Sequence, residues 1–185
     1  GGINFNLRVI RTYLNWLFEE DLIHEKIKIK FINEGKVMPH YISEDLFNKL
    51  LNLDWLPEHY KRSFYFYLTT GCRKTEPFIG RLDKNWLIVN SDISKGKNLR
   101  QIQLDSYQLK IINEMRDRYD CHLGKGYKAY THLDSYNKMF KKALNHFNKN
   151  DTRSLHDLRH TFAVIRWLET SDIYRVKSEL GHSSV

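Results

Sequence analysis

Residues 154–160 read Ser-Leu-His-Asp-Leu-Arg-His and carry the most information about the fold of this 185-residue chain. Ser154 with Asp157 three residues later is typical of a helix start, which places His156 in the first helical turn. Arg159 follows three residues after His156 and therefore lies on the same face of the helix. An imidazole, a guanidinium and free backbone amides at one helix N-terminus suit an anion. The alternative is a histidine that only caps or packs.

The same stretch also permits a metal site, because His156 and His160 are four residues apart. A zinc protease places a glutamate beside the first histidine, where this chain has Asp157, whose side chain is one methylene shorter. Arg159 would bring a cation close to the metal, and no third ligand occurs at a recognisable spacing. We therefore expect no metal, and a metal-dependent hydrolase built on His156 and His160 is the remote alternative.

A second segment, residues 70–76, reads Thr-Gly-Cys-Arg-Lys-Thr-Glu. A helix is expected to stop at Gly71, and the turn after it would hold Arg73 rigid. Glu76 could orient the guanidinium of Arg73 so that it grips a phosphate through two donors. An arginine after a glycine turn is otherwise an ordinary solvated loop charge.

Two further positions complete the candidate residues. Lys95 stands in a Lys-Gly-Lys-Asn turn between two apolar runs, where it could protect a strand edge or enter a DNA groove. His182 follows Leu180 and Gly181 at an expected helix end, where it could simply interact with the last carbonyl groups. Neither position indicates a function when taken alone.

Hydrophobic periodicity sets the first 40 residues apart from the rest. An amphipathic helix is expected from Ile3 to about Glu20, and its apolar face is too wide for a lone helix to bury. Residues 1–23 are therefore expected to be the end of a preceding domain. Residues 24–40 are charged and lack a period, as expected of a linker.

Residues 41–185 combine several amphipathic helices with two short apolar runs that predict a β-hairpin. The expected fold class is α+β, mostly α-helical with a small antiparallel β-sheet. Helices are expected at about residues 43–51, 58–70, 107–119, 136–147, 155–170 and 172–180, and strands at 86–91 and 99–104.

The composition favours a polyanionic partner. The chain has 30 Lys and Arg against 22 Asp and Glu, a formal charge of +8, and phosphate contacts by basic residues supply most non-specific affinity for nucleic acids. The longest apolar run is about five residues, far below the roughly 20 that a membrane span needs. Two cysteines cannot form a disulfide framework, so a cytoplasmic location is expected.

Taken in chain order, these segments resemble the active-site series of the tyrosine recombinases, the phage integrase family. The family pattern is T-G-x-R-x-x-E, a lysine in the turn between the second and third strands, H-x-L-R-H-[ST]-x-A, and L-G-H. Residues 70–76, Lys95, 156–163 and 180–182 match it. The resemblance covers residues 41–185, and it implies that residues 1–23 are the last helix of a core-binding, SAM-like domain.

Two details qualify the match. Lys95 fits better than Lys97, because the family lysine usually precedes a glycine, as Lys95 does, and a basic residue such as Arg100 starts the next strand. Pro77 departs from the aliphatic residue that the family usually has after the glutamate. A helix there must begin near Pro77, since proline is tolerated only in the first turn.

The resemblance implies site-specific recombination of a mobile element, by cleavage and rejoining of double-stranded DNA through a 3′-phosphotyrosine, without a cofactor. Arg73 and Arg159 would neutralise the transition state. Lys95 would protonate the leaving 5′-oxygen, and His156 would assist proton transfer from the nucleophile.

The remaining implied roles concern the surroundings of the phosphate. His182 would donate a hydrogen bond to it, with Glu76 and His160 in support. The family nucleophile is a tyrosine shortly after the L-G-H histidine, a place that would lie beyond Val185. Tyr174 precedes that histidine and is expected to be exposed or to pack.

The resemblance also implies a homotetramer on DNA. Two alternatives stay open within it. One is a non-catalytic DNA-binding module from a truncated recombinase, and the other is a topoisomerase that uses the same cleavage reaction.

Overall fold

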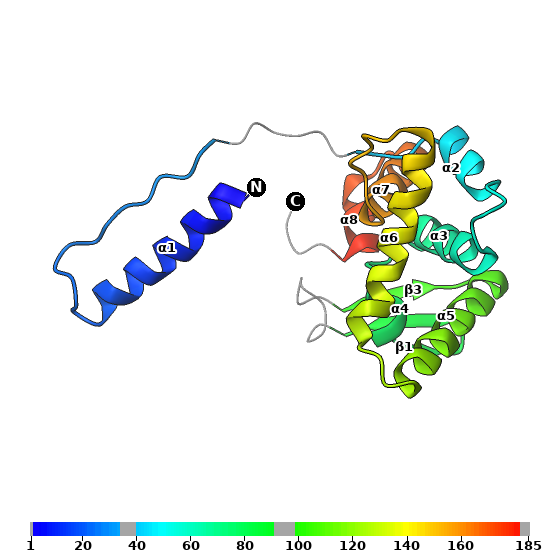
Figure 1. Cartoon of the computed structure of the whole chain (residues 1–185), viewed down its shortest axis with the longest axis horizontal. Helices are drawn as coiled ribbons and strands as arrows, with labels where there is room; N and C mark the ends of the chain where they lie inside the picture. Colours follow the sequence, from blue (N-terminus) through cyan, green and yellow to red (C-terminus); the bar gives the residue numbers. More distant parts are fainter. Residues whose placement is uncertain (1, 34–39, 91–98, 182–185) are drawn as a thin grey trace. The chain divides into compact units, whose positions relative to one another are not determined.

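The computed structural model describes residues 2–33, 40–90 and 99–181. These residues form two compact units, Gly1–Met38 and Pro39–Val185, which are described separately (Figure 1). In the described part of the chain, no helix is long and apolar enough to cross a membrane.

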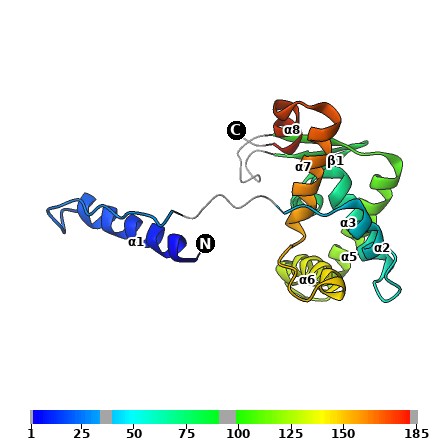
Figure 2. The same cartoon turned by 90° about the horizontal axis from the view of Figure 1, so that it is seen from above.

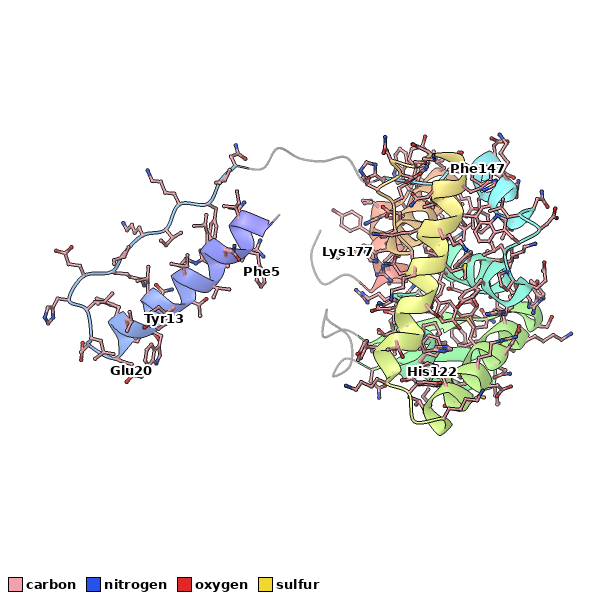
Figure 3. The ribbon with its side chains drawn as sticks, viewed as in Figure 1. Phe5, Tyr13, Glu20, His122, Phe147 and Lys177 are labelled. Atoms are coloured by element: carbon pink, nitrogen blue, oxygen red, sulfur yellow. The ribbon has the colours of Figure 1, made fainter. Side chains whose placement is uncertain are left out.

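The first unit contains one helix, followed by an irregular segment that turns back toward the start of that helix. Helix α1 spans Gly2–Glu19, as predicted. Two residues of the expected linker contact this helix: the Asn4 side chain exchanges two hydrogen bonds of 2.9 Å with the backbone of Ile32, and the Arg11 guanidinium lies over the Phe31 ring. Large apolar side chains of α1, including Phe5 and Tyr13 (Figure 3), remain exposed.

The second unit is mostly helical with a small antiparallel sheet, which confirms the predicted fold class. The helices of this unit are α2 (Glu44–Leu51), α3 (Glu58–Thr70), α4 (Glu76–Ile79), α5 (Ser106–Gly124), α6 (Ala129–Phe147), α7 (His156–Thr170) and α8 (Ile173–Leu180). The strands are β1 (Arg81–Asp83), β2 (Trp86–Val89) and β3 (Arg100–Gln103). They form one sheet in the order β1-β2-β3, in which neighbouring strands are antiparallel.

Local signals explain most helix ends. The Ser43 hydroxyl accepts from the backbone of Leu46 and caps α2. Asp105 and Gln108 form a capping box at the start of α5. Asp172 caps α8, and Gly181 closes it in the left-handed conformation.

Helix α3 forms the centre of the core. It packs against α5, α6 and α7, and Phe64, Phe66 and Tyr67 are fully buried on it. The Phe64 ring meets Phe140 of α6 edge to face, with centroids 4.9 Å apart. Figure 2 shows α6 on one side of the unit and α8 with the sheet on the other. Helix α7 packs against both α3 and α8, and α8 packs against β3. The last residue of α3, Thr70, accepts a hydrogen bond from Arg100 of β3.

Helix α4 begins at Glu76 with Pro77 in its first turn, which confirms the predicted helix start near Pro77. Two other elements differ from the prediction. The sequence did not indicate β1, which is only three residues long. Helix α6 begins at Ala129 rather than near residue 136. The earlier start was missed because most of its first seven residues are polar or exposed and show no apolar period.

Candidate active site

Arg73 follows directly on the end of α3. Gly71 closes that helix with φ of 60°, and a Cβ there would lie 2.5 Å from the Phe162 ring of α7. The chain can therefore turn close to α7 only with glycine at this position. The Tyr67 hydroxyl donates to the Lys74 carbonyl at 2.8 Å and holds the loop to the core.

One carboxylate fixes Arg73 at two points. Its backbone amide donates to Oε2 of Glu76 at 2.8 Å, and its Nη1 donates to Oε1 at 2.7 Å. Glu76 is only 2% exposed, whereas the Arg73 side chain keeps 22% of its surface exposed. The expectation that Glu76 orients Arg73 thus has a direct geometric basis, and part of the guanidinium faces solvent.

Glu76 gathers two more arginines. Arg100 Nη1 donates to Oε2 of Glu76, and Arg159 Nη1 lies 3.9 Å from the same oxygen. Burial by itself would raise the pKa of Glu76, but Arg100, the hydrogen bonds from Arg73 and the charge of Arg159 bring it below its ordinary value. Glu76 is therefore ionised at neutral pH.

Arg159 projects from the first turns of α7 into the interior and is 3% exposed. Its Nη1 donates to the Gly71 carbonyl at 2.6 Å, and its Nη2 donates to the Leu180 carbonyl at the end of α8. Burial, followed by the positive charges of Arg100 and Arg73, lowers the pKa of Arg159 to about 10. The guanidinium stays charged at neutral pH, and the neighbouring arginines repel it more than Glu76 offsets.

His156 and His160 lie one turn apart on α7, with ring centroids 4.8 Å apart and the rings nearly perpendicular. Partial burial, then the charges of His160 and Arg159, lower the pKa of His156. Its neutral form, which can accept a proton, is thus favoured at neutral pH. His156 also borders a cavity of about 290 Å³ whose lining includes Cys72, Lys74 and Asn137.

The start of α7 differs in detail from the prediction. The Ser154 hydroxyl does not accept a helix amide; the backbone amide and the hydroxyl of Ser154 both donate to Oδ2 of Asp157, at 2.7 and 3.0 Å. A carboxylate is the stronger acceptor, so the serine hydroxyl serves as donor. The helix begins at His156, which confirms that this histidine lies in the first turn.

The structure brings Arg73 and Arg159 to one carboxylate, with Arg73 Nη1 at 2.7 Å and Arg159 Nη1 at 3.9 Å from the Glu76 oxygens. Burial lowers the pKa of His156 most, and the charges of both arginines lower it further. Lys95 and His182 lie outside the described residues. Among residues 2–33, 40–90 and 99–181, no group of three or more His, Cys, Asp or Glu side chains is arranged to hold a metal ion.

The family resemblance gave Arg100 only as a basic residue at the start of a strand and implied no role for it. Its side chain is buried beside Glu76. A signal was present: Ile102 and Leu104 alternate with exposed glutamines, and extending that alternation back by two residues turns Arg100 toward the interior.

No protein-family model and no curated protein sequence matches this chain. Solved structures do. The Tn1549 transposon integrase (residues 82–397), in complex with circular intermediate DNA, superposes with a TM-score of 0.65 at 15% identity, over 99% of this chain and 71% of that one. A lambda integrase (75–356) dimer bound to a COC′ core site gives 0.64 at 15% identity, over 95% and 71%.

The XerA recombinase gives a TM-score of 0.55 at 20% identity, over 81% of this chain and 58% of that one. Similarity at this level of identity concerns the fold. The second unit contributes the mostly helical architecture and the small antiparallel sheet that these proteins share. This chain has the fold of the tyrosine recombinases.

Proposed function

We propose that this chain is the phosphate-binding part of a site-specific tyrosine recombinase that integrates or excises a mobile element. The observation that carries the proposal is the joining of Arg73 and Arg159 through the buried carboxylate of Glu76. It occurs in a fold shared with integrases whose structures contain DNA.

The charges around Glu76 favour an anionic ligand. Among the described residues, the guanidinium groups of Arg73, Arg100 and Arg159 lie within 4.0 Å of this single carboxylate. Burial lowers the pKa of Arg159 most, and the positive charges of Arg100 and Arg73 lower it further. A phosphodiester beside the exposed edge of Arg73 would supply negative charge where the cluster has an excess of positive charge.

The cluster suits strand cleavage by nucleophilic attack on phosphorus. Negative charge on the non-bridging oxygens grows in the transition state, and guanidinium groups already fixed by hydrogen bonds stabilise it without reorganising. His156, neutral at physiological pH, is suited to receive the proton of an attacking tyrosine.

The remaining parts of the proposal come from the family resemblance. Lys95 would protonate the leaving 5′-oxygen, and His182 would donate a hydrogen bond to the phosphate, with His160 in support. Double-stranded DNA is the proposed substrate, with a homotetramer as the active assembly in the cytoplasm. The attacking tyrosine is proposed to lie beyond Val185.

Fluorescence anisotropy with a labelled duplex of randomised sequence tests the proposal. A protein that neutralises 6–10 phosphates loses about 10³ to 10⁵ in affinity between 50 and 200 mM salt, and we expect a steep dependence of this kind. Arg73→Ala should weaken binding and lower the salt slope by about one. Arg62→Ala is the matched control, because the Arg62 guanidinium already forms an ion pair with both carboxylate oxygens of Glu114 and is not part of the cluster around Glu76.

Duplex binding that does not respond to salt, or equal effects of Arg73→Ala and Arg62→Ala, would overturn the proposal. A denaturing gel of the same mixtures should show no covalent DNA adduct. An adduct would place the nucleophile within these 185 residues and contradict its proposed location.

A further inference from the structure

Arg100 is the first residue of β3, where it pairs with Val89 of β2. It is 3% exposed, and each of its three guanidinium nitrogens donates to a different segment. Nη1 donates to Oε2 of Glu76, Nη2 to the Thr70 carbonyl at 2.9 Å, and Nε to the Glu179 carbonyl at 2.6 Å.

These acceptors mark the ends of the segments that carry the proposed phosphate ligands. Thr70 ends α3 just before Arg73, Glu76 begins α4, and Glu179 lies in the last turn of α8. Gly181 packs against the aliphatic stem of Arg100, since a Cβ there would lie 3.2 Å from its Cδ. One side chain therefore joins α3, α4 and α8 at a single point.

Arg159 makes a second set of contacts with the same helix ends. Arg159 donates to the carbonyl of Gly71, one residue after Thr70, and to that of Leu180, one residue after Glu179. Arg100 and Arg159 thus bind adjacent carbonyls at the same two helix ends, and both lie beside Oε2 of Glu76. The separation of those helix ends sets where Arg159 and Arg73 lie relative to each other.

Arg100 itself is poorly placed to bind substrate. All three of its nitrogens already donate to protein acceptors, and almost none of its surface is exposed. Within the described residues, by contrast, the Arg73 guanidinium donates a hydrogen bond only through Nη1, to Glu76, and keeps an exposed edge.

We propose that Arg100 is a positioning residue of the proposed recombination reaction: it holds Glu76 and the ends of α3 and α8 so that Arg73 and Arg159 face one phosphate. The inference rests on the proposed function, because it concerns the same phosphate site. Positioning by Arg100 depends on the planar guanidinium, which donates to three acceptors at fixed angles, and a positive charge alone is insufficient. A lysine at this position would keep the charge but could not donate in these three fixed directions.

The test uses the ¹⁵N-labelled chain titrated with inorganic phosphate and followed by NMR at the Arg73 backbone amide. We expect Arg100→Lys to weaken phosphate binding about tenfold, the effect of losing a charge-assisted hydrogen bond in the site. In a Glu76→Gln background the same change should cost less than tenfold, because the charge-assisted bond from Arg100 to Glu76 is already weakened and only its contacts with the ends of α3 and α8 remain to be lost.

Arg116→Lys is the matched control. Arg116 also ties a helix to backbone carbonyls, donating to Pro77 at 2.7 Å and to Gly80, but no hydrogen bond or ion pair found in the described residues joins it to Glu76. Both lysine variants should lower the unfolding temperature, whereas only Arg100→Lys should weaken phosphate binding. Equal phosphate affinities in the two variants, or the full tenfold loss persisting in the Glu76→Gln background, would overturn the inference.

A measurement without ligand separates this inference from the proposed function. The Arg73 amide proton is bonded to Glu76, so its hydrogen exchange should speed up in Arg100→Lys and stay unchanged in Arg116→Lys. Unchanged exchange in both overturns the inference, even if wild-type chain binds phosphate. If wild-type chain binds no phosphate at Arg73, the proposed function fails instead.

A second variant covers the case in which Arg100→Lys does not fold. Arg100→Met fills similar space without a charge, and such apolar replacements of buried ionic groups are often tolerated. It should show the same loss of phosphate affinity and the same faster exchange at Arg73. Wild-type values for both would overturn the inference.

Discussion

Gly71→Ala should destabilise the second unit far more than a glycine substitution normally does. Gly71 has φ of 60°, a conformation that costs a residue with a Cβ roughly 1–2 kcal/mol. The new methyl would also lie 2.5 Å from Cδ1 and 2.9 Å from Cγ of Phe162. Because those atoms belong to the Phe162 side chain of α7, either α7 or the loop that contains residue 71 must shift.

The magnitude follows from adding the two effects. Overpacking of this kind costs about 1–3 kcal/mol, so the free energy of unfolding should fall by about 2–5 kcal/mol in total. The shift would also move the Gly71 carbonyl, which accepts from Arg159 at 2.6 Å. The variant is therefore expected to weaken phosphate binding as well as stability.

Gly126→Ala is the matched control for the backbone cost. Gly126 has φ of 80°, and a Cβ there meets no atom within 4 Å, so only the conformational cost applies. Urea unfolding of both variants, followed by circular dichroism, gives the difference directly. In a Phe162→Ala background the extra cost of Gly71→Ala should vanish, as a double-mutant cycle would show.

A difference of less than about 0.5 kcal/mol between Gly71→Ala and Gly126→Ala, the usual spread of neutral substitutions, would contradict a clash at Gly71. The same conclusion would follow if the extra cost persisted without the Phe162 ring, since the close approach to that ring is its cause.

Three further predictions concern the core, a helix cap and acid sensitivity. Phe140→Ala should cost about 3–5 kcal/mol in urea unfolding, because it leaves a cavity against Phe64; a cost below about 1 kcal/mol would contradict the packing. Asp105→Ala should cost about 0.5–2 kcal/mol, while Asp105→Asn keeps most of the cap; equal losses would contradict it. Burial, then the charge of His122, lowers the pKa of His132 to about 4 from 6.5. The unfolded chain therefore binds more protons, and stability falls as pH drops through that window. His132→Phe should lose less stability than wild type between pH 7 and pH 5, and equal losses would refute this.

The sequence predicted best those features that depend on near neighbours. The end of α3 at Gly71 and the closing of α8 at Gly181 follow from glycine's tolerance of positive φ. Arg73 and Glu76 are three residues apart across one turn, so their pairing could be expected from spacing alone. In each case the interacting groups lie within one or two turns of chain.

For the short helix α4 the sequence indicated only a start near Pro77, because the stabilisation of this helix is tertiary. Helix α4 has four residues, too few to show an apolar period, and it is fixed by contacts with α5. Arg116 of α5 donates to the carbonyls of Pro77 and Gly80 at the two ends of that helix. Any residue provides a backbone carbonyl, so such a contact leaves no trace in the residue pattern.

The same reason accounts for Arg100. Its partners Glu76, Thr70 and Glu179 are 24, 30 and 79 residues away in the chain, and two of these acceptors are backbone carbonyls. Arg159 likewise reaches Gly71 across 88 residues. The sequence therefore identifies the residues that are suited to contact a phosphate, whereas the residues that place them become visible only when the helix ends are brought together. A mutational search restricted to the motif residues would miss Arg100, because its importance arises from buried geometry and not from contact with DNA.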